Sequence, residues 1–376
     1  MQIPRAYQDL EKHLKENKVL ILFGPRQVGK TTLLQNYLKN CPYKYKLESG
    51  DNLRVQNILG SQDFKQIKEY CQGYELIAVD EAQRIPGIGM GLKILVDQVP
   101  GIRVITTGSS SFEVAGQIGE PLTGRKVTLT LYPISQLELA AFQNPGEMKE
   151  NLEEALIFGG YPDVVTAGDR KKKARILEEL VQSYLLKDIL ELERVKSSKK
   201  VLDLLRLLAF QAGQQTSLSE LGQQIGIDYK TVGRYLDLFE KSFVIASVRG
   251  FSHNLRKEIS KKCKYYFYDT GIRNAIIANF NGLELRNDTG ALWENFLFME
   301  RLKKRTYHEI FANYYFWRTW EGQEIDLVEE REGRLFGYEF KRGKKRPAKG
   351  SREWQAAYPE ASMEVIDREN YLSFIT

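Results

Sequence analysis

Residues 24–31 read Gly-Pro-Arg-Gln-Val-Gly-Lys-Thr, and this stretch decides the fold of the first part of the chain. Its spacing is G-x-x-x-x-G-K-[ST], in which the two glycines let the backbone curl until successive N–H groups point inward at an anion. Residues 19–23 before it form an apolar run that is typical of a buried parallel strand. Residues 31–38 after it have the pattern of a helix whose first turn faces the same anion. Strand, loop and helix in this order predict a loop that binds phosphate groups.

We expect this loop to bind the triphosphate of ATP or GTP, and a chance glycine-rich turn is the alternative. Lys30 is expected to reach the β- and γ-phosphates, and the Thr31 hydroxyl is expected to bind Mg²⁺. The predicted nucleotide-binding residues are Gly24, Pro25, Arg26, Gln27, Val28, Gly29, Lys30, Thr31 and Thr32.

A second apolar stretch, residues 76–79, ends in two acids, Asp80 and Glu81. Because Mg²⁺ prefers oxygen ligands and keeps its water shell, Asp80 is expected to bind the metal through water. Glu81 is placed to act as the general base that activates the attacking water. The alternative is a strand capped by two solvated acids, and the phosphate loop upstream argues against it.

Two further segments carry candidate residues for the same reaction. The strand of residues 103–107 ends in a polar tip, where a hydroxyl would orient the attacking water; Ser109 is the first choice and Thr107 the second. A polar loop without this role is an equally good interpretation. Arg125 precedes another strand, residues 127–131, from which it would reach the γ-phosphate of a neighbouring subunit. A solvated surface arginine is the alternative there.

This half of the chain resembles the AAA superfamily of ATPases, and more narrowly its prokaryotic members with a winged helix and a C-terminal domain of unknown function. The resemblance implies an ATPase that works as a homo-oligomer, with Arg125 as the arginine finger in trans. A second sensing arginine in the lid, usual in much of the superfamily, has no obvious position. The segments that carry the resemblance are GPRQVGKTT, VDEAQRIP, TTGSSSF, LTGRKVTLTLYPIS, FGGYPDV and KYYFYDTGIR.

Composition places few limits on the partners. The 376 residues predict two or three domains, and 42% hydrophobic with 28% charged residues is typical of a globular protein. We expect a cytoplasmic protein without a membrane span, since no apolar run approaches the roughly 20 residues required and no secretory leader is evident. The three isolated cysteines predict neither a disulfide framework nor a zinc site.

The positive charge is concentrated in the second half of the chain. Residues 341–352 contain seven basic residues and no acidic ones. We expect these clusters to attract a polyanion, with a solvated basic face as the alternative. The smaller clusters are Lys261, Lys262 and Lys264, and Arg301, Lys303, Lys304 and Arg305.

The pattern of the elements predicts four parts. Residues 1–140 alternate strand-like and helix-like segments, which predicts an α/β fold with a parallel sheet covered by helices. Residues 141–195 turn helical and are interpreted as a lid. Residues 196–272 have the order of a winged helix, and residues 273–376 are expected to form a second α/β domain.

The winged-helix prediction depends on its caps. Ser217 with Glu220 forms a capping-box pattern, and Asp228 is placed to cap the next helix. Two short strands, residues 244–248 and 265–268, follow as the wing. We expect DNA binding by the third helix, although winged helices also mediate protein contacts. The residues it would present to a major groove are Tyr229, Lys230, Thr231 and Arg234.

The last hundred residues contain a predicted acidic hairpin. An even-length loop around residues 332–333 places Asp326 across from Glu339, with Lys341 on the same face as Glu339. Two carboxylates opposite each other repel unless a cation lies between them. We therefore expect Mg²⁺, or Mn²⁺, bound by Asp326, Glu339 and the Phe340 carbonyl, with Glu294 completing the shell.

This hairpin resembles the PD-(D/E)xK nucleases of the restriction-endonuclease-like fold, in the form with an extra helical glutamate. By that resemblance Glu294, Asp326, Glu339 and Lys341 are the implied catalytic residues, although Ile325 stands where a proline is usual. The alternative is an exposed hairpin with cross-strand ion pairs.

Three functions fit these observations. The first is an ATP-driven enzyme that binds DNA and cleaves it with a metal. The second is a regulatory or signalling ATPase whose nuclease-like domain is an inert binding module. The third is a nucleotide-dependent transcription factor, which the winged helix alone suggests.

Overall fold

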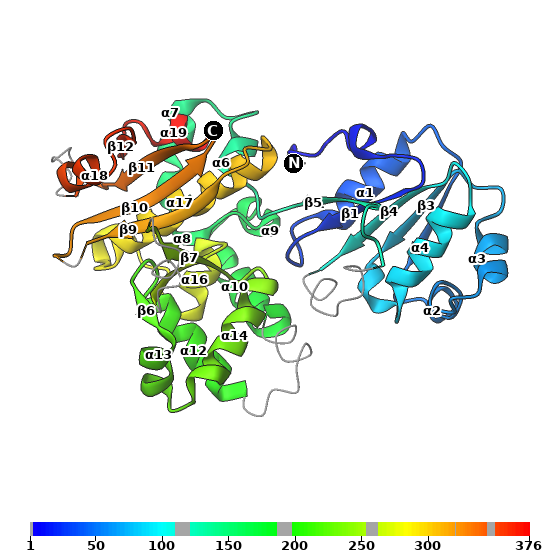
Figure 1. The fold of residues 1–376 in the computed structure, drawn as a ribbon, viewed down its shortest axis with the longest axis horizontal. Coiled ribbons are helices and arrows are strands. Elements are labelled where there is room, and N and C mark those ends of the chain that lie inside the picture. Colours follow the sequence, from blue (N-terminus) through cyan, green and yellow to red (C-terminus); the bar gives the residue numbers. More distant parts are fainter. Residues whose placement is uncertain (1–2, 110–120, 186–197, 253–261, 320, 344–349) are drawn as a thin grey trace.

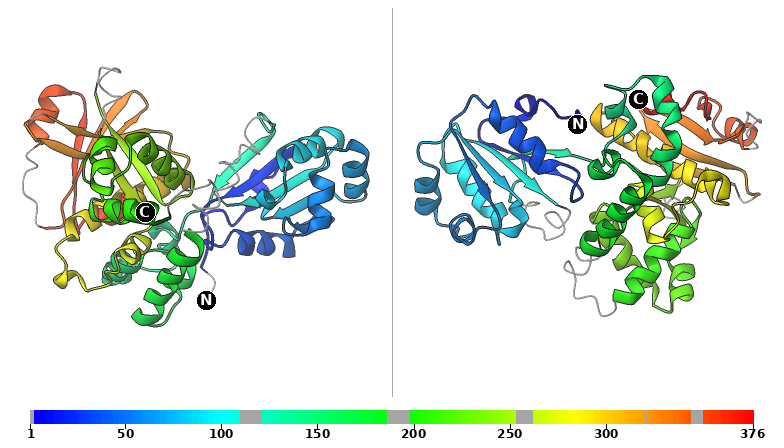
Figure 2. Two further views of the ribbon diagram at one scale, coloured as in Figure 1. Left: turned by 90° about the horizontal axis from the view of Figure 1, so that it is seen from below. Right: turned by 180° about the vertical axis from the view of Figure 1, so that it is seen from behind.

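The computed structural model describes residues 3–109, 121–185, 198–252, 262–319, 321–343 and 350–376. Two sheets lie in separate parts of the molecule, and the chain after the first sheet leads across to the second (Figure 1). The views from below and from behind give the same arrangement (Figure 2). Among the described residues, no helix has both the length and the apolar character needed to cross a bilayer.

The first sheet is parallel and has the strand order β2-β3-β4-β1-β5. Its central strands are buried on both faces, which confirms the α/β fold predicted for residues 1–140. Helix α1 covers one face, and α2, α3 and α4 cover the other. The strands are β1 (Lys18–Phe23), β2 (Tyr45–Ser49), β3 (Leu76–Asp80), β4 (Arg103–Gly108) and β5 (Lys126–Thr130). The helices are η1 (Leu10–His13), α1 (Lys30–Lys39), α2 (Leu53–Leu59), α3 (Phe64–Cys71), η2 (Ala82–Arg84) and α4 (Ile88–Gln98).

A run of helices follows this sheet and packs mainly against the second part of the molecule. Helix α8 contacts α16, and α10 contacts both α9 and α16. The helices are α6 (Gln136–Leu139), α7 (Pro145–Glu150), α8 (Leu152–Phe158), α9 (Pro162–Val165), α10 (Arg170–Glu179) and the π-helix η3 (Leu180–Leu185).

The segment predicted as a winged helix has the expected caps. Ser217 and Glu220 form a capping box at the start of α13, and the Asp228 carboxylate caps α14. These elements are α12 (Ser198–Phe210), β6 (Thr216–Ser217), α13 (Leu218–Ile225), α14 (Tyr229–Lys241), β7 (Ile245–Gly250) and β8 (Lys262–Phe267).

The second sheet has the order β12-β11-β10-β9-β7-β8-β6 and joins this segment to the C-terminal part. Strands β7 and β9 form the junction as a parallel pair. The predicted boundary at residue 272 therefore falls between two segments that share one sheet. The remaining elements are α16 (Thr270–Ile276), η4 (Leu283–Leu285), α17 (Thr289–Tyr307), β9 (Asn313–Arg318), β10 (Glu324–Arg331), β11 (Arg334–Phe340), α18 (Ser351–Ala357), β12 (Ser362–Ile366) and α19 (Tyr371–Ile375).

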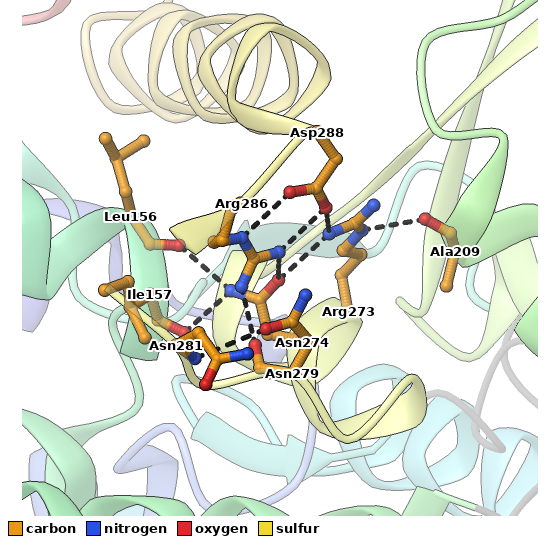
Figure 3. A network of polar contacts seen from close by, with 9 residues as sticks. All are labelled: Leu156, Ile157, Ala209, Arg273, Asn274, Asn279, Asn281, Arg286 and Asp288. Atoms are coloured by element: carbon orange, nitrogen blue, oxygen red, sulfur yellow. Dashed lines mark hydrogen bonds and ion pairs between the residues drawn. The ribbon is translucent and has the colours of Figure 1, made fainter. Parts of the chain in front are cut away.

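A buried polar network fixes α16 against its neighbours (Figure 3). Arg273 and Arg286 both donate hydrogen bonds to the carboxylate of Asp288, just before α17. Arg273 also donates to the Ala209 carbonyl at 2.8 Å, and the Asn274 amide donates to the Ile157 carbonyl at 2.8 Å. The network thus joins α8, α12, α16 and the start of α17.

Part of the predicted basic surface is wrong. Arg301, Lys303 and Arg305 are buried on α17 rather than exposed to a polyanion. Arg301 donates to both carboxylate oxygens of Glu329, at 2.8 and 2.9 Å, so its charge is already neutralised. Residue 261 and residues 344–349, which belong to the other basic clusters, lie outside the described residues.

Candidate active site and a second acidic centre

The predicted phosphate loop connects β1 to α1 at the carboxyl edge of the first sheet. Gly24 and Gly29 have φ values of 147° and 93°, a region that glycine adopts without strain. A side chain on Gly24 would also collide with the Leu131 carbonyl. Lys30 is buried, and its Nζ donates to the carbonyls of Gly24 at 3.0 Å and Pro25 at 2.6 Å. The two glycines therefore have the backbone conformation that the predicted loop requires, and contact of Lys30 with phosphates stays a prediction.

Asp80 lies at the same edge of the sheet as this loop because β1, β4 and β3 are parallel. The Thr31 hydroxyl is 3.0 Å from each oxygen of the Asp80 carboxylate. The Thr107 hydroxyl, at the tip of β4, donates to Asp80 at 2.5 Å. Of the two hydroxyls predicted at this tip, Thr107 makes the contact with the acid. Ser109 is buried, and its backbone N–H lies 3.4 Å from the Gln83 amide oxygen.

Glu81 is held in an unusual backbone conformation next to Asp80. Its φ and ψ are 52° and 42°, in the left-handed region that costs a non-glycine residue about 1–3 kcal/mol. Its N–H donates to the Thr107 hydroxyl at 2.9 Å, and its carboxylate accepts from the Gln83 amide at 2.5 Å. Gly50 packs so closely on the Glu81 carbonyl that a side chain there would collide. These contacts fix the backbone from which the predicted general base projects.

Arg5 connects the phosphate loop to the second part of the molecule, a role that the sequence analysis missed. Its guanidinium donates to the Val28 carbonyl in the loop, to the Tyr132 carbonyl at 2.6 Å and to the Glu138 carboxylate at 2.8 Å. Both ionic side chains are almost fully buried, at 10% and 2% exposure. The two residues are 133 positions apart, so no local pattern could have indicated the pair.

Two clefts border the loop on the side of the predicted lid. The larger one, of about 750 Å³, is lined by Arg5, Thr32 and Asn36 and by Pro162 and Asp163 of α9. A smaller neighbouring cleft brings Lys172 of α10 and Gln27 of the loop to one lining. Helices α9 and α10 therefore contribute residues to the clefts that border the loop. Lys172 is a cation in the region where no second sensing arginine was evident.

Arg125 lies at the opposite edge of the sheet from the loop. Its carbonyl accepts from the N–H of Val19, which is near the start of β1. The loop follows the end of β1, about 16 Å away along a strand of this length. Arg125 pairs with Asp97 at 2.6 Å and is 40% exposed. It therefore cannot serve the loop of its own chain, and its action in trans stays a prediction.

Helix α14 exposes three of the four residues predicted to contact DNA. Tyr229, Lys230 and Arg234 are exposed. The Thr231 hydroxyl instead donates to the Asp228 carboxylate at 2.6 Å as part of the helix cap. DNA contact by these residues stays a prediction.

The C-terminal hairpin has the predicted register. Leu327 pairs with Tyr338 across β10 and β11, so Asp326 and Glu339 come opposite each other. The Asp326 carboxylate accepts from the Phe340 N–H at 2.8 Å. Burial and the nearby Glu294 carboxylate raise the pKa of Asp326 to about 8. The predicted acids of this centre therefore lie together.

A lysine that the sequence analysis placed on a basic surface lies among these acids. Lys264 of β8 is 2% exposed, and its Nζ is 2.6 Å from Glu324, 2.9 Å from Glu294 and 3.9 Å from Asp326. Burial alone lowers the pKa of Lys264, but the surrounding carboxylates raise it well above its ordinary value. Its predicted role in attracting a polyanion is therefore wrong.

The predicted metal does not fit this centre as it stands. In the described parts of the chain, no group of three or more His, Cys, Asp or Glu side chains is arranged to bind a metal ion. Glu339 pairs with Lys341 through one carboxylate oxygen. The Lys264 ammonium lies beside Glu294 and Asp326, two of the acids that were expected to bind Mg²⁺ or Mn²⁺.

Comparison with family models divides the chain into three segments. Residues 16–140 match the model of an AAA domain. This part of the chain is therefore similar to an AAA domain. Residues 149–284 and 289–373 match two models that are each described only as a domain of unknown function, DUF8612 and DUF4143.

Similar proteins occur in distant organisms. An uncharacterised protein of Mycobacterium tuberculosis is 27% identical over 337 residues, which cover 89% of this chain and 72% of the relative. One from Methanocaldococcus jannaschii is 24% identical, and the matched residues cover 85% of this chain and 74% of the relative. Among solved structures, a variant of RuvB from Thermotoga maritima aligns at 18% identity with a TM-score of 0.30, covering 61% of this chain and 81% of that one.

Proposed function

We propose that this protein hydrolyses ATP at the carboxyl edge of the five-stranded sheet. The observation that carries the proposal is the position of Asp80, which contacts the Thr31 hydroxyl of the phosphate loop and the Thr107 hydroxyl of β4. This arrangement brings a metal-binding carboxylate, a hydroxyl ligand and the loop lysine to one place. The match of residues 16–140 to an AAA domain favours ATP as the nucleotide.

The residues present account for each requirement of the reaction. Water attacks the γ-phosphorus, the bond to the ADP oxygen breaks, and the proton from water passes to Glu81. Lys30 and the backbone N–H groups of the loop stabilise the charge that develops on the phosphate oxygens. Mg²⁺ bound with the nucleotide would contact Thr31 and, through water, Asp80.

The second part of this proposal is that nucleotide state is transmitted to the C-terminal part through Arg5. Arg5 binds the Val28 carbonyl within the loop and the Glu138 carboxylate outside it. Helix α6, which contains Glu138, also contacts the C-terminal part, since its Gln136 N–H donates at 2.6 Å to Glu300 of α17. A displacement of the loop on binding phosphate would therefore act on a buried ion pair.

DNA is the partner that we propose for the segment containing α14. Lys230 and Arg234 are exposed on this helix, while its Val232 and Tyr235 are buried against the other elements. A helix with this division can lie in a major groove while its other face stays in the core. The Lys264 ammonium among the acids of the C-terminal centre favours a module that binds DNA without cutting it.

The test of the proposal is ATP turnover by Lys30→Ala. Lys39→Ala is the matched control, because Lys39 is an exposed lysine at the other end of α1. Phosphate release should fall by about a hundredfold or more in Lys30→Ala, the effect of removing one preorganised charge, and stay unchanged in the control. Equal turnover in the two variants would contradict the assignment of the loop.

A further inference from the structure

The acidic centre of the C-terminal part is assembled from three separate segments. Glu294 comes from α17, Glu324 and Asp326 from β10, and Lys264 from β8. Strand β8 is far from β10 in the sequence, but β7 and β9 lie between them in one continuous sheet. The lysine therefore reaches the acids because the winged-helix strands extend the sheet of the C-terminal part.

The charges of this centre require a cation. Glu294, Glu324 and Asp326 are only 19%, 26% and 17% exposed, so water screens their repulsion poorly. Arg318 reaches the outer side of Glu324 at 3.4 Å but is 44% exposed. Lys264 is the buried cation that all three carboxylates share in the described structure.

The surroundings of Lys264 hold its ammonium in this position. The Tyr266 hydroxyl donates at 2.6 Å to the same Glu294 oxygen that the ammonium contacts. The Tyr266 ring stacks on Phe298 at 4.4 Å, and the Phe316 ring lies 5.6 Å from the lysine Nζ. The lysine is therefore enclosed by aromatic rings and carboxylates and cannot turn toward solvent without breaking these contacts.

A second observation concerns Glu339, which is 6% exposed. One of its oxygens pairs with Lys341, and the other is buried without a hydrogen-bond partner in the described structure. This oxygen is a further candidate ligand for a cation. An ammonium ion has only three hydrogens with which to contact oxygen atoms. Divalent metals bind more oxygen ligands than that.

We propose that the Lys264 ammonium is the resident cation of this centre and takes the place of a divalent metal. It joins β8 to α17 and β10 as an ionic lock. The C-terminal part then binds its partner without metal-dependent cleavage. The acids would bind a divalent metal only after the lysine ammonium has been removed.

The test measures Mn²⁺ binding to the full chain by electron paramagnetic resonance, without nucleotide. An Asp80→Asn background removes the metal position of the nucleotide site. Lys264→Ala opens the centre, and Lys262→Ala is the matched control because Lys262 is an exposed lysine on the same strand. We expect Lys264→Ala to bind one Mn²⁺ per chain that neither the background nor Lys262→Ala binds, since a buried positive charge has been removed.

Adding Asp326→Asn to Lys264→Ala should abolish this gain, and Mn²⁺ should raise the melting temperature of Lys264→Ala but not of the background. The proposal is wrong if a folded Lys264→Ala chain acquires no Mn²⁺. It is also wrong if the chain that keeps Lys264 binds Mn²⁺ and loses it on Asp326→Asn. The latter comparison needs no change at Lys264, so it decides the matter even if Lys264→Ala fails to fold.

Discussion

The two acidic centres of this molecule use the same residue types under opposite conditions. At the nucleotide site, Asp80 is held by the hydroxyls of Thr31 and Thr107. In the C-terminal centre, Glu294 and Asp326 lie against the buried ammonium of Lys264. A hydroxyl fixes a carboxylate and leaves its negative charge, whereas an ammonium ion cancels that charge. The first centre therefore keeps the negative charge that the proposed metal requires, whereas a buried cation balances part of the negative charge in the second.

This difference arises from other strands of each sheet rather than from the acidic strand itself. Strand β4 is one of the two neighbours of β3, and its tip contributes Thr107. The second sheet continues through β9 and β7 to β8, which contributes Lys264. The chemistry of a carboxylate thus depends on which side chain another strand of the sheet brings to it, and this is set by the topology of the sheet.

The strongest test concerns the proposed nucleotide site and uses Glu81→Gln. Glutamine keeps the size of the side chain but cannot accept a proton, so turnover of ATP should fall by about a thousandfold. Binding of ATP, measured by calorimetry, should persist because the loop and Lys30 are unchanged. Glu69→Gln is the control, since Glu69 is 63% exposed on α3. Loss of ATP binding in Glu81→Gln would assign this acid a different role.

The next effect concerns assembly and depends on Arg125. If this arginine stabilises the transition state in a neighbouring subunit, Arg125→Ala should lower turnover by about a hundredfold. Mixing Arg125→Ala with Glu81→Gln should then restore part of the activity, because a Glu81 site can receive an intact arginine from the other variant. The measurement is phosphate release from the mixture at increasing protein concentration. No recovery at any ratio would leave Arg125 as a surface residue paired with Asp97.

The features of both parts of the molecule that have local signals were predictable from the sequence. The phosphate loop, the acids after β3 and the register of the C-terminal hairpin each depend on neighbouring residues or on strand alternation. The cation of the second centre was not predictable. Lys264 and Glu294 meet only after a parallel pairing of β7 with β9, which no turn or spacing in the sequence indicates.

The third prediction extends the comparison to a buried ion pair that neither binds a nucleotide nor fills an acidic centre. Arg5→Ala leaves Glu138 buried without its arginine, which should lower the free energy of unfolding by about 3–5 kcal/mol. Arg175→Ala removes an 82% exposed arginine from a surface pair and should cost about 1 kcal/mol at most. Urea denaturation of both variants measures the two costs. Equal costs would show that the Arg5 pair does not hold the two parts together.

A smaller effect is expected for the exposed face of α14. If Lys230 and Arg234 contact phosphates, each change to alanine should reduce the slope of log affinity against log salt by about one. Lys241→Ala is the control, because Lys241 pairs with Asp237 at 2.7 Å at the end of the helix. Fluorescence anisotropy with duplex DNA at several salt concentrations gives the slopes. An unchanged slope in both variants would favour a protein partner for this helix.

The smallest expected effect concerns Asp288, a carboxylate that is paired with two arginines rather than with a lysine. Asp288 lies beside Arg273 and Arg286, and although burial alone raises its pKa, their hydrogen bonds lower it to about 2. Because the folded-state pKa lies below the ordinary value of 3.8, the stabilisation is complete above about pH 4 and is lost as the pH falls toward 2.

The free energy of unfolding should therefore differ between the native protein and Asp288→Asn by about 2 kcal/mol at pH 6, and the difference should shrink between pH 4 and pH 2. Urea denaturation across this range measures it, with Asp237→Asn on the exposed surface as the control. A difference that stays constant down to pH 2 would mean that the two arginines orient Asp288 without lowering its pKa. In that case the arginine network of Figure 3 acts through geometry, and only the lysine centre acts through charge.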